Sequence, residues 1–235
     1  IIERVVAACR PVPVTAKIRL GCTRDRITAI EIAQVVEGAG AAALTVHGRT
    51  REQGYSGQAE HHTVAAVKAA LRIPVVANGD IDSPEKAREV LRYTAADALM
   101  IGRAAQGRPW IFREIGHFLA TGEYLPAPAV TQAKRWLLEH LHDHYSLYGE
   151  FAGVRTARKH IGWAVRSLPG GEAFRAEMNL LETCDKQVRA LSDWFDELAD
   201  HHDLWPAAAN AANQPYIRLR SEERRVGKEC TNSCR

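Results

Sequence analysis

Four short apolar runs alternate with segments of helical periodicity in the first half of the chain. The runs are rich in β-branched residues, each ends near a glycine or a polar side chain, and they span residues 13–21, 42–50, 73–81 and 96–102. Because these runs are nearly continuous rather than alternating, they predict strands of a parallel sheet that is covered on both faces. An earlier helix is indicated by apolar residues at helical spacing, namely Ile2, Val5, Val6 and Cys9.

Helix signals follow the first three runs. Apolar residues recur every three or four positions in residues 27–40, 62–71 and 83–94. Thr28 and Glu31 have the spacing of a capping box, and Ser83 followed by Pro84 is typical of a helix start. Strand and helix alternate roughly every 25 to 30 residues, so the pattern predicts successive βα units.

From about Pro126 onward the pattern becomes helical throughout. We therefore expect a β/α domain over residues 1–125 and a helical domain over residues 126–205. No strand-like run interrupts the second part. Its helical segments are 129–149, 154–168, 171–184 and 185–202.

Polar side chains at the ends of the apolar runs decide between two α/β architectures, a doubly wound sheet and part of an eight-stranded barrel. In a barrel the carboxyl ends of the strands converge on one face, where the active site is built. The sequence therefore predicts the C-terminal half of a (β/α)8 TIM barrel, followed by helices. The residues at these ends are Lys17, Arg19, His47, Arg49, Asn78, Asp80 and Arg103.

Glycines at two of these strand ends indicate a phosphate site. Gly102 allows the backbone to approach a phosphate closely, and the guanidinium of Arg103 offers two parallel donors. Gly79 has the same role one strand earlier. Barrels commonly bind phosphate after their last two strands, which is where we place these runs.

Composition and charge remove several function classes. The 235 residues are 46% hydrophobic and 25% charged, which is ordinary for a globular protein, and the formal net charge of +3 is too small for a surface that binds nucleic acid everywhere. No apolar run is long enough to span a membrane and no signal peptide is recognisable, so we expect a cytoplasmic protein. The five cysteines have unrelated spacings, which predicts neither disulfides nor a metal site.

A local cluster of basic residues remains as a possible nucleic-acid contact. Arg155, Arg158, Lys159 and Arg166 share one helix face, which suits a phosphate backbone but also suits a solvated surface. The large aromatic residues give no such signal. Trp136, Trp163 and Trp194 lie in apolar helical stripes, which predicts core packing rather than stacking on bases.

Both ends of the sequence look unusual. The chain opens without Met on a helical pattern, so we expect it to be an N-terminally truncated fragment. The stretch "RSEERRVGKEC" near the other end resembles the translation of a sequencing adapter. Residues 206–235 are therefore expected to be a disordered or artefactual tail without a functional role.

Several motifs in order together resemble the tRNA-dihydrouridine synthase family, and most closely its bacterial B-type branch. The resemblance covers about residues 13–195, and its most specific part is the long "MIGRAAQGRPW" run followed by "RKHIGW". The other motifs are "KIRLG", "VHGRT", "GYSGQAE" and "VVANGDI".

The resemblance implies an FMN enzyme that reduces the C5=C6 bond of uridines in tRNA, with NADPH as the reductant. It assigns Lys17 and His47 to the flavin, and Arg155, Arg158 and Lys159 to the tRNA. The family's general acid, a cysteine in a Gly-Cys-Pro motif, has no counterpart here, so we expect no catalytic residue in this chain and place that acid upstream of Ile1. The resemblance also implies that the ribityl-phosphate arm of FMN is held by Asn78, Gly79, Asp80, Gly102 and Arg103.

Two other functions remain open at this point. Another FMN-dependent barrel oxidoreductase acting on a small metabolite shares the "NGD" and "GR" motifs but does not predict "RTARKHIGW". A noncatalytic RNA-binding fragment is favoured if the protein really begins at Ile1. No protein partner is inferred.

Overall fold

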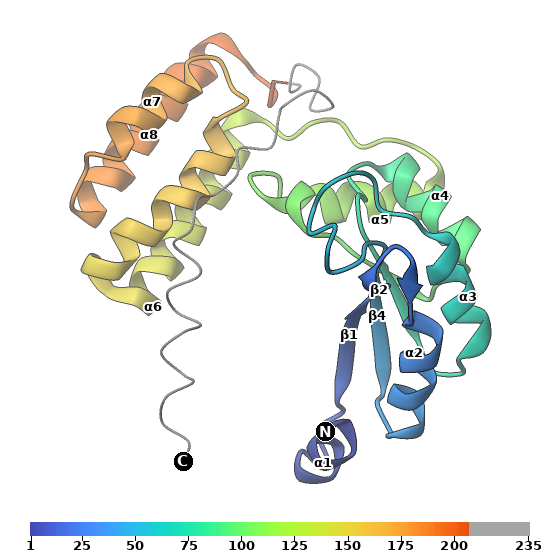
Figure 1. Cartoon of the computed structure of the whole chain (residues 1–235). Helices are drawn as coiled ribbons and strands as arrows, with labels where there is room; N and C mark the ends of the chain where they lie inside the picture. The colour runs from blue at the N-terminus through green and yellow to red at the C-terminus, as the bar shows by residue number, and fades with distance from the viewer. Residues whose placement is uncertain (207–235) are drawn as a thin grey trace, which may run out of the picture.

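A computed structural model describes residues 1–206 (Figure 1). The predicted tail lies outside these residues from position 207 onward. We refer to residues 1–125 as the β/α region and to residues 126–206 as the helical region. Figure 1 shows them as two bodies that are joined by an extended linker.

Four parallel strands form the main sheet of the β/α region. Their order β1-β4-β5-β6 follows the order of the chain, as in a barrel, whereas a doubly wound sheet reverses its order. This arrangement, followed by helices, confirms the predicted fold class. The strands are β1 (Thr15–Arg19), β4 (Ala43–His47), β5 (Val75–Asn78) and β6 (Ala98–Met100).

Helices cover one face of this sheet, and Figure 1 shows α2, α3 and α4 together on one side of the strands. The core between them contains Leu44, Val46 and Val75, which are wholly buried. On the other face Lys17 and Met100 are exposed, so the expectation of a sheet covered on both faces is wrong for this chain. The inner face of a barrel is closed by its other strands rather than by helices. The helices of this region are α1 (Ile2–Ala8), α2 (Ala29–Gly38), α3 (His62–Ala70), α4 (Pro84–Thr94) and α5 (Ile111–Thr121).

Four elements of the β/α region were not assigned from the sequence. Three are short: an antiparallel hairpin of β2 (Gly21–Thr23) and β3 (Arg26–Ile27) follows β1, and the 3₁₀ helix η1 (Arg103–Ala105) follows β6. The fourth is helix α5, which has 11 residues. Both hairpin strands have too few residues for a periodic pattern to be recognised.

The helical region packs around its own apolar core, which includes Leu141, Ile161, Leu191 and Phe195. The first two predicted segments are halves of one long element, α6, that is interrupted at Gly149, where φ is 69° and ψ is 177°. The elements are α6 (Val130–Val165), α7 (Gly171–Met178) and α8 (Cys184–His201).

A loop of the β/α region makes a close backbone contact with α6. Gly107 has a φ of 75°, and a Cβ at this position would overlap the carbonyl oxygen of Trp163. Only glycine allows both this conformation and this approach. The contact fixes the loop after β6 against the helical region.

Candidate cofactor site

The predicted site residues of the β/α region come together because the strands end level with one another. Arg19 pairs in register with His47, His47 with Asn78, and Asn78 with Met100. The side chain of Asn78 also donates from Nδ2 to the Met100 carbonyl oxygen at 2.8 Å, which links β5 to β6 at this edge. Residues that are about 30 positions apart in the sequence thus share one edge of the sheet.

The carboxylate of Asp80 is the centre of the polar contacts at this edge. Arg49 donates to it twice, from Nη1 to Oδ1 at 2.9 Å and from Nη2 to Oδ2 at 2.6 Å. Arg103 donates from Nη2 to Oδ1 at 2.9 Å, and the backbone N–H of Ala59 donates to Oδ2 at 2.8 Å. Partial burial acts to raise the pKa of Asp80, but the hydrogen bonds from Arg49 and Ala59 and the two cations lower it overall. Asp80 is therefore an anion.

Arg49, which the sequence placed at a strand end without giving it a role, is a structural centre of the site. Its side chain is only 2% exposed, and besides Asp80 it donates to the carbonyl oxygens of Ser56 at 3.3 Å and Gly57 at 2.6 Å. It therefore fixes the loop of residues 54–60 to the strand ends. The available signal was its position two residues after His47, at the end of an apolar run.

Tyr55 lies between two cations at the mouth of the site. The Arg103 guanidinium carbon is 4.8 Å from the centre of its ring, and that of Arg19 is 5.7 Å from it. Arg19 also donates from Nη1 to the carbonyl oxygens of Thr50 and Gly54, at 2.8 and 2.9 Å. The side chain of Arg103 is thus held at the edge of the sheet by an ion pair and a ring contact together.

The two strand-end glycines have different surroundings. Gly79 has a φ of 127°, and a Cβ there would lie 2.7 Å from the Cβ of Ala59 and 3.1 Å from Cδ2 of His47. A side chain at this position would push the loop away from β4. Gly102, in contrast, has no atom within 4 Å of its ideal Cβ position, so the space beside it is open.

His47 and Lys17 show that this edge is electropositive. Burial, followed by the charges of Arg19, Lys17 and Arg49, lowers the pKa of His47 to about 4. Burial and then Arg19 also lower the pKa of Lys17, whose side chain lies on the open face of β1. A neutral imidazole surrounded by cations suits an anionic ligand.

The predicted basic residues of α6 do not behave alike. Arg155 and Lys159 are exposed, and Arg155 donates to the Phe151 carbonyl oxygen at 2.9 Å while its guanidinium lies 3.7 Å from the Phe151 ring centre. Arg158 is half-buried and donates to the carbonyl oxygen of Leu181 at 3.3 Å. Only two of the three side chains therefore point toward solvent.

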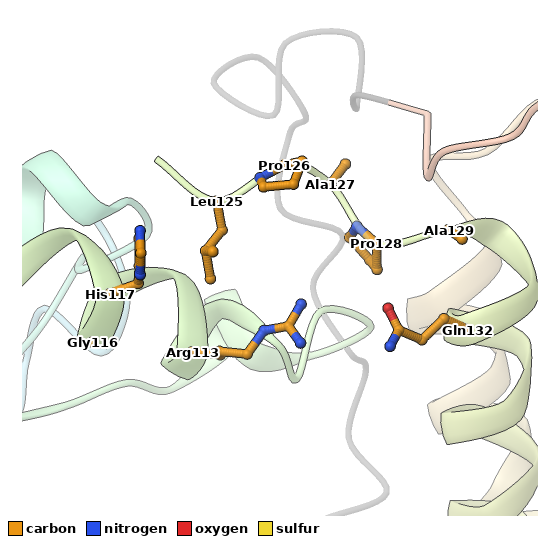
Figure 2. Close-up of a pocket in the computed structure, with 9 residues that line it drawn as sticks. All are labelled: Arg113, Gly116, His117, Leu125, Pro126, Ala127, Pro128, Ala129 and Gln132. Carbon is orange, nitrogen blue, oxygen red and sulfur yellow. The ribbon is translucent and has the colours of Figure 1, made fainter. Parts of the chain in front are cut away.

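A separate cavity of about 620 Å³ lies along the linker between the two regions (Figure 2). Figure 2 shows Arg113 and Gln132 on either side of it, with prolines of the linker above. None of the strand-end residues lines this cavity. It is distinct from the site around Asp80.

Among residues 1–206, no helix has the length and apolar character needed to cross a membrane. Within the same range, no three His, Cys, Asp or Glu side chains are grouped so that they could hold a metal ion.

Known proteins of one family match most of this chain. The family model described as "Dihydrouridine synthase (Dus)" matches residues 1–199. The tRNA-dihydrouridine synthase B of Pseudomonas aeruginosa is 54% identical over 197 residues, which cover 84% of this chain and 59% of that protein. The proteins of the same name from Xanthomonas axonopodis pv. citri and Vibrio cholerae are 55% and 51% identical, over 86% and 85% of this chain and 60% and 62% of their own lengths.

The chain thus spans about 60% of the length of the curated relatives that it matches. The match nevertheless includes both the strand-end cluster around Asp80 and the basic residues of α6. The chain belongs to the dihydrouridine synthase family.

Proposed function

We propose that this chain is the flavin-phosphate and RNA-binding part of an FMN-dependent tRNA-dihydrouridine synthase, which reduces the C5=C6 bond of uridine in tRNA with NADPH. The observation that carries the proposal is the cluster of Arg49, Asp80 and Arg103 beside the open backbone of Gly102. Two guanidinium groups and one carboxylate leave a net positive charge there. The same residues lie in a chain that matches the family model.

The residues at this edge fit an FMN phosphate. Arg103 lies at the mouth of the site, 40% exposed, and its planar guanidinium matches the geometry of a phosphate. The open space beside Gly102 admits a phosphate close to the backbone. Asp80, whose carboxylate would repel a phosphate, is assigned to orient Arg103 and Arg49.

Lys17 and His47 are assigned to the flavin ring system. When bound, FMN supplies the hydride for C6 of the uracil, and its electronic properties depend on nearby charge. Lys17 brings a positive charge, and the pKa of its amino group is lowered, mainly by burial. His47 is neutral at pH 7 because its pKa is about 4, so it offers one ring nitrogen as donor and the other as acceptor. Asn78 and Gly79 hold the backbone edge on which these side chains stand.

The general acid that protonates C5 of the uracil is assigned to a residue outside this chain. Hydride addition at C6 leaves negative charge at C5, which a positioned acid must protonate. The sequence contains no Gly-Cys-Pro motif. Cys22 is exposed on the β2–β3 hairpin and is not assigned this role.

The tRNA backbone is assigned to the helical region. Arg155 and Lys159 are exposed one helical turn apart on α6 and can meet neighbouring phosphates. Arg158, which bonds to the Leu181 carbonyl, contributes charge but orients inward. A cytoplasmic location follows from the proposed substrate, since tRNA is modified there.

The test is dihydrouridine formation on unmodified tRNA with FMN and NADPH. The chain as given and the chain extended at its N-terminus to the length of its relatives are compared. The extended protein should form dihydrouridine, whereas the given chain should be slower by at least the roughly 10²- to 10⁴-fold that a general acid contributes. Failure of the extended protein to reduce any tRNA uridine would refute the proposed function. Equal rates would show that the acid lies within these 235 residues.

A further inference from the structure

A second cavity, of about 280 Å³, lies between the loop after β6 and helix α6. Four indole rings and two imidazole rings line it. Lys17, His47 and Asp80 do not line it, and of the residues assigned to FMN only Gly102 does. The residues that matter for its chemistry are Gly102, Trp110, Trp136, His140, His160 and Trp163.

The tryptophans of this cavity are not ordinary core residues. The sequence pattern predicts core packing for Trp136, Trp163 and Trp194, and this is correct only for Trp194, which stacks on Phe174 with 4.8 Å between ring centres. All three rings are partly buried, but Trp136 and Trp163 line the cavity, whereas Trp194 packs against the core of the helical region. Trp110, from the other wall, is 5.8 Å from Trp136 between ring centres. Indole rings from both regions thus line one space.

The walls are held in place before any ligand arrives. The Gly107 backbone lies against the Trp163 carbonyl, and Trp205 packs edge-on against Trp110 with ring centres 4.9 Å apart. Fixed walls reduce the entropy lost on binding, which favours a specific ligand.

The cavity also offers polar groups at its edge. The His140 and His160 rings are 4.8 Å apart between centres, and the His160 ring is 5.2 Å from that of Trp163. Burial, and then the charges of His140 and His144, lower the pKa of His160, so its ring carries both a donor and an acceptor nitrogen. The guanidinium of Arg113 lies 5.5 Å from the centre of the Trp136 ring and adds a positive charge nearby.

These features describe a ligand with flat apolar faces, an edge of hydrogen-bonding groups and an attached anion. Indole walls suit the faces, the imidazoles suit the edge, and Arg113 suits a phosphate. At about 280 Å³ the cavity lies just below the roughly 300–1,000 Å³ of pockets for drug-sized ligands, so it accommodates one or two fused rings. An unpaired nucleobase has this chemistry and this size.

We propose that the cavity between the loop after β6 and α6 binds one unpaired nucleobase of the RNA substrate, other than the uridine that is reduced. Gly102 lines this cavity and also borders the proposed FMN phosphate site, so the two sites are neighbours. A base held here would anchor the RNA strand beside the reacting uridine. The inference rests on the proposed function, because it takes the ligand to be tRNA.

The test uses tRNA that carries the fluorescent base 2-aminopurine at one unpaired position at a time, bound to the extended protein. One position should lose its fluorescence on binding, because stacking on indole quenches it. Trp136→Leu and Trp163→Leu should each restore the emission and weaken tRNA binding by about tenfold or more. Phe112→Leu is the matched control, since this exposed ring does not line the cavity and should leave both measurements unchanged.

The outcomes separate the inference from the proposed function. If tRNA binds and is reduced but no position is quenched, or if quenching persists in both tryptophan variants, the nucleobase pocket is refuted and the synthase is not. The pocket would also be refuted if NADP⁺ displaced the quenched base while FMN stayed bound. The cavity would then be a binding site for the dinucleotide. Absence of any tRNA binding and of dihydrouridine formation counts against the proposed function itself. Circular dichroism of each variant verifies that it has folded.

Discussion

The buried ion pair at the strand ends of the β/α region differs from the exposed pairs along the helices of the helical region. In the β/α region Arg49 and Asp80 are 31 positions apart, and their ion pair buries the arginine completely. In the helical region the pairs Arg135–Glu139 and Glu172–Arg175 join neighbouring turns of one helix at the surface. Exposed pairs of this kind contribute about 0–1 kcal/mol, whereas breaking a buried pair is much more damaging.

This difference indicates where each region can be changed without loss of structure. The charges of the β/α region hold strand ends and loops together, so that binding and stability depend on the same side chains. The exposed charges of the helical region remain available to a partner in solution. The following experiments test this contrast, beginning with the largest expected effect.

Replacing Arg49 should give the largest loss of stability. In Arg49→Leu the carboxylate of Asp80 loses two hydrogen bonds, and the carbonyls of Ser56 and Gly57 lose their donor. We expect the free energy of unfolding to fall by about 3 kcal/mol, at the lower end of the range for broken buried pairs because Asp80 is partly exposed. Urea unfolding followed by circular dichroism measures this.

The exposed Arg51, two positions along the chain, provides the control. Arg51→Leu should change the free energy of unfolding by less than about 0.5 kcal/mol, as is usual for surface substitutions. If the two variants unfold at the same urea concentration, Arg49 does not hold the loop in the way described.

His47 should make the protein less stable in acid. Its folded-state pKa of about 4 lies below the ordinary 6.5, so the unfolded chain takes up a proton first as the pH falls. The free energy of unfolding should therefore decrease between about pH 6.5 and 4, by an amount on the order of 3 kcal/mol for this residue. In urea titrations, His47→Gln should lose less free energy of unfolding over this range than the unchanged chain. The control His142→Gln, at an exposed position, should lose as much as the unchanged chain.

Replacing Arg103 should affect binding more than folding. Its side chain is 40% exposed and contacts Asp80 and the Tyr55 ring at the mouth of the site. In the extended protein, Arg103→Ala should weaken FMN binding by about 1.5 to 3 kcal/mol, the range for a hydrogen bond to a charged group. Flavin fluorescence titration measures this, with the exposed Arg92→Ala as control. An unchanged affinity for FMN would show that Arg103 does not bind the phosphate.

In the helical region, two basic residues should matter for RNA and one for the fold. Loss of each phosphate contact lowers the slope of log Kobs against log[salt] by about 0.7 to 0.9. Arg155→Ala with Lys159→Ala should therefore lower the tRNA slope by about 1.5, while Arg158→Ala should change it little and reduce stability instead, because Arg158 bonds to Leu181. An equal change of slope from Arg158→Ala would mean that its side chain turns outward on binding.

The sequence indicated the strand-end site well but the helical surface poorly, and the reason is geometric. Parallel strands that follow one another bring their carboxyl ends to one edge, so Lys17, Asn78 and Arg103 could be placed together from their positions alone. Helical periodicity indicates which residues share a face but not what packs on that face. Trp136 and Trp163 therefore line a cavity where a core was expected, and Arg158 turns inward where a surface was expected.

The smallest expected effect concerns the two helix starts for which the sequence predicted a capping residue, Thr28 and Ser83. The hydroxyl of Ser83 accepts a hydrogen bond from the Lys86 N–H at 3.1 Å, whereas the side chain of Thr28 makes no capping hydrogen bond to α2. Ser83→Ala should lower the free energy of unfolding by about 1 kcal/mol, and Thr28→Ala by less than about 0.5 kcal/mol. Thr28 directly follows the β2–β3 hairpin, and its backbone N–H donates to the Leu20 carbonyl oxygen at 2.9 Å, so the tertiary fold rather than the side chain sets the start of α2. Thermal unfolding of both variants measures the difference, and a loss from Thr28→Ala as large as that from Ser83→Ala would show that the threonine side chain caps its helix in solution.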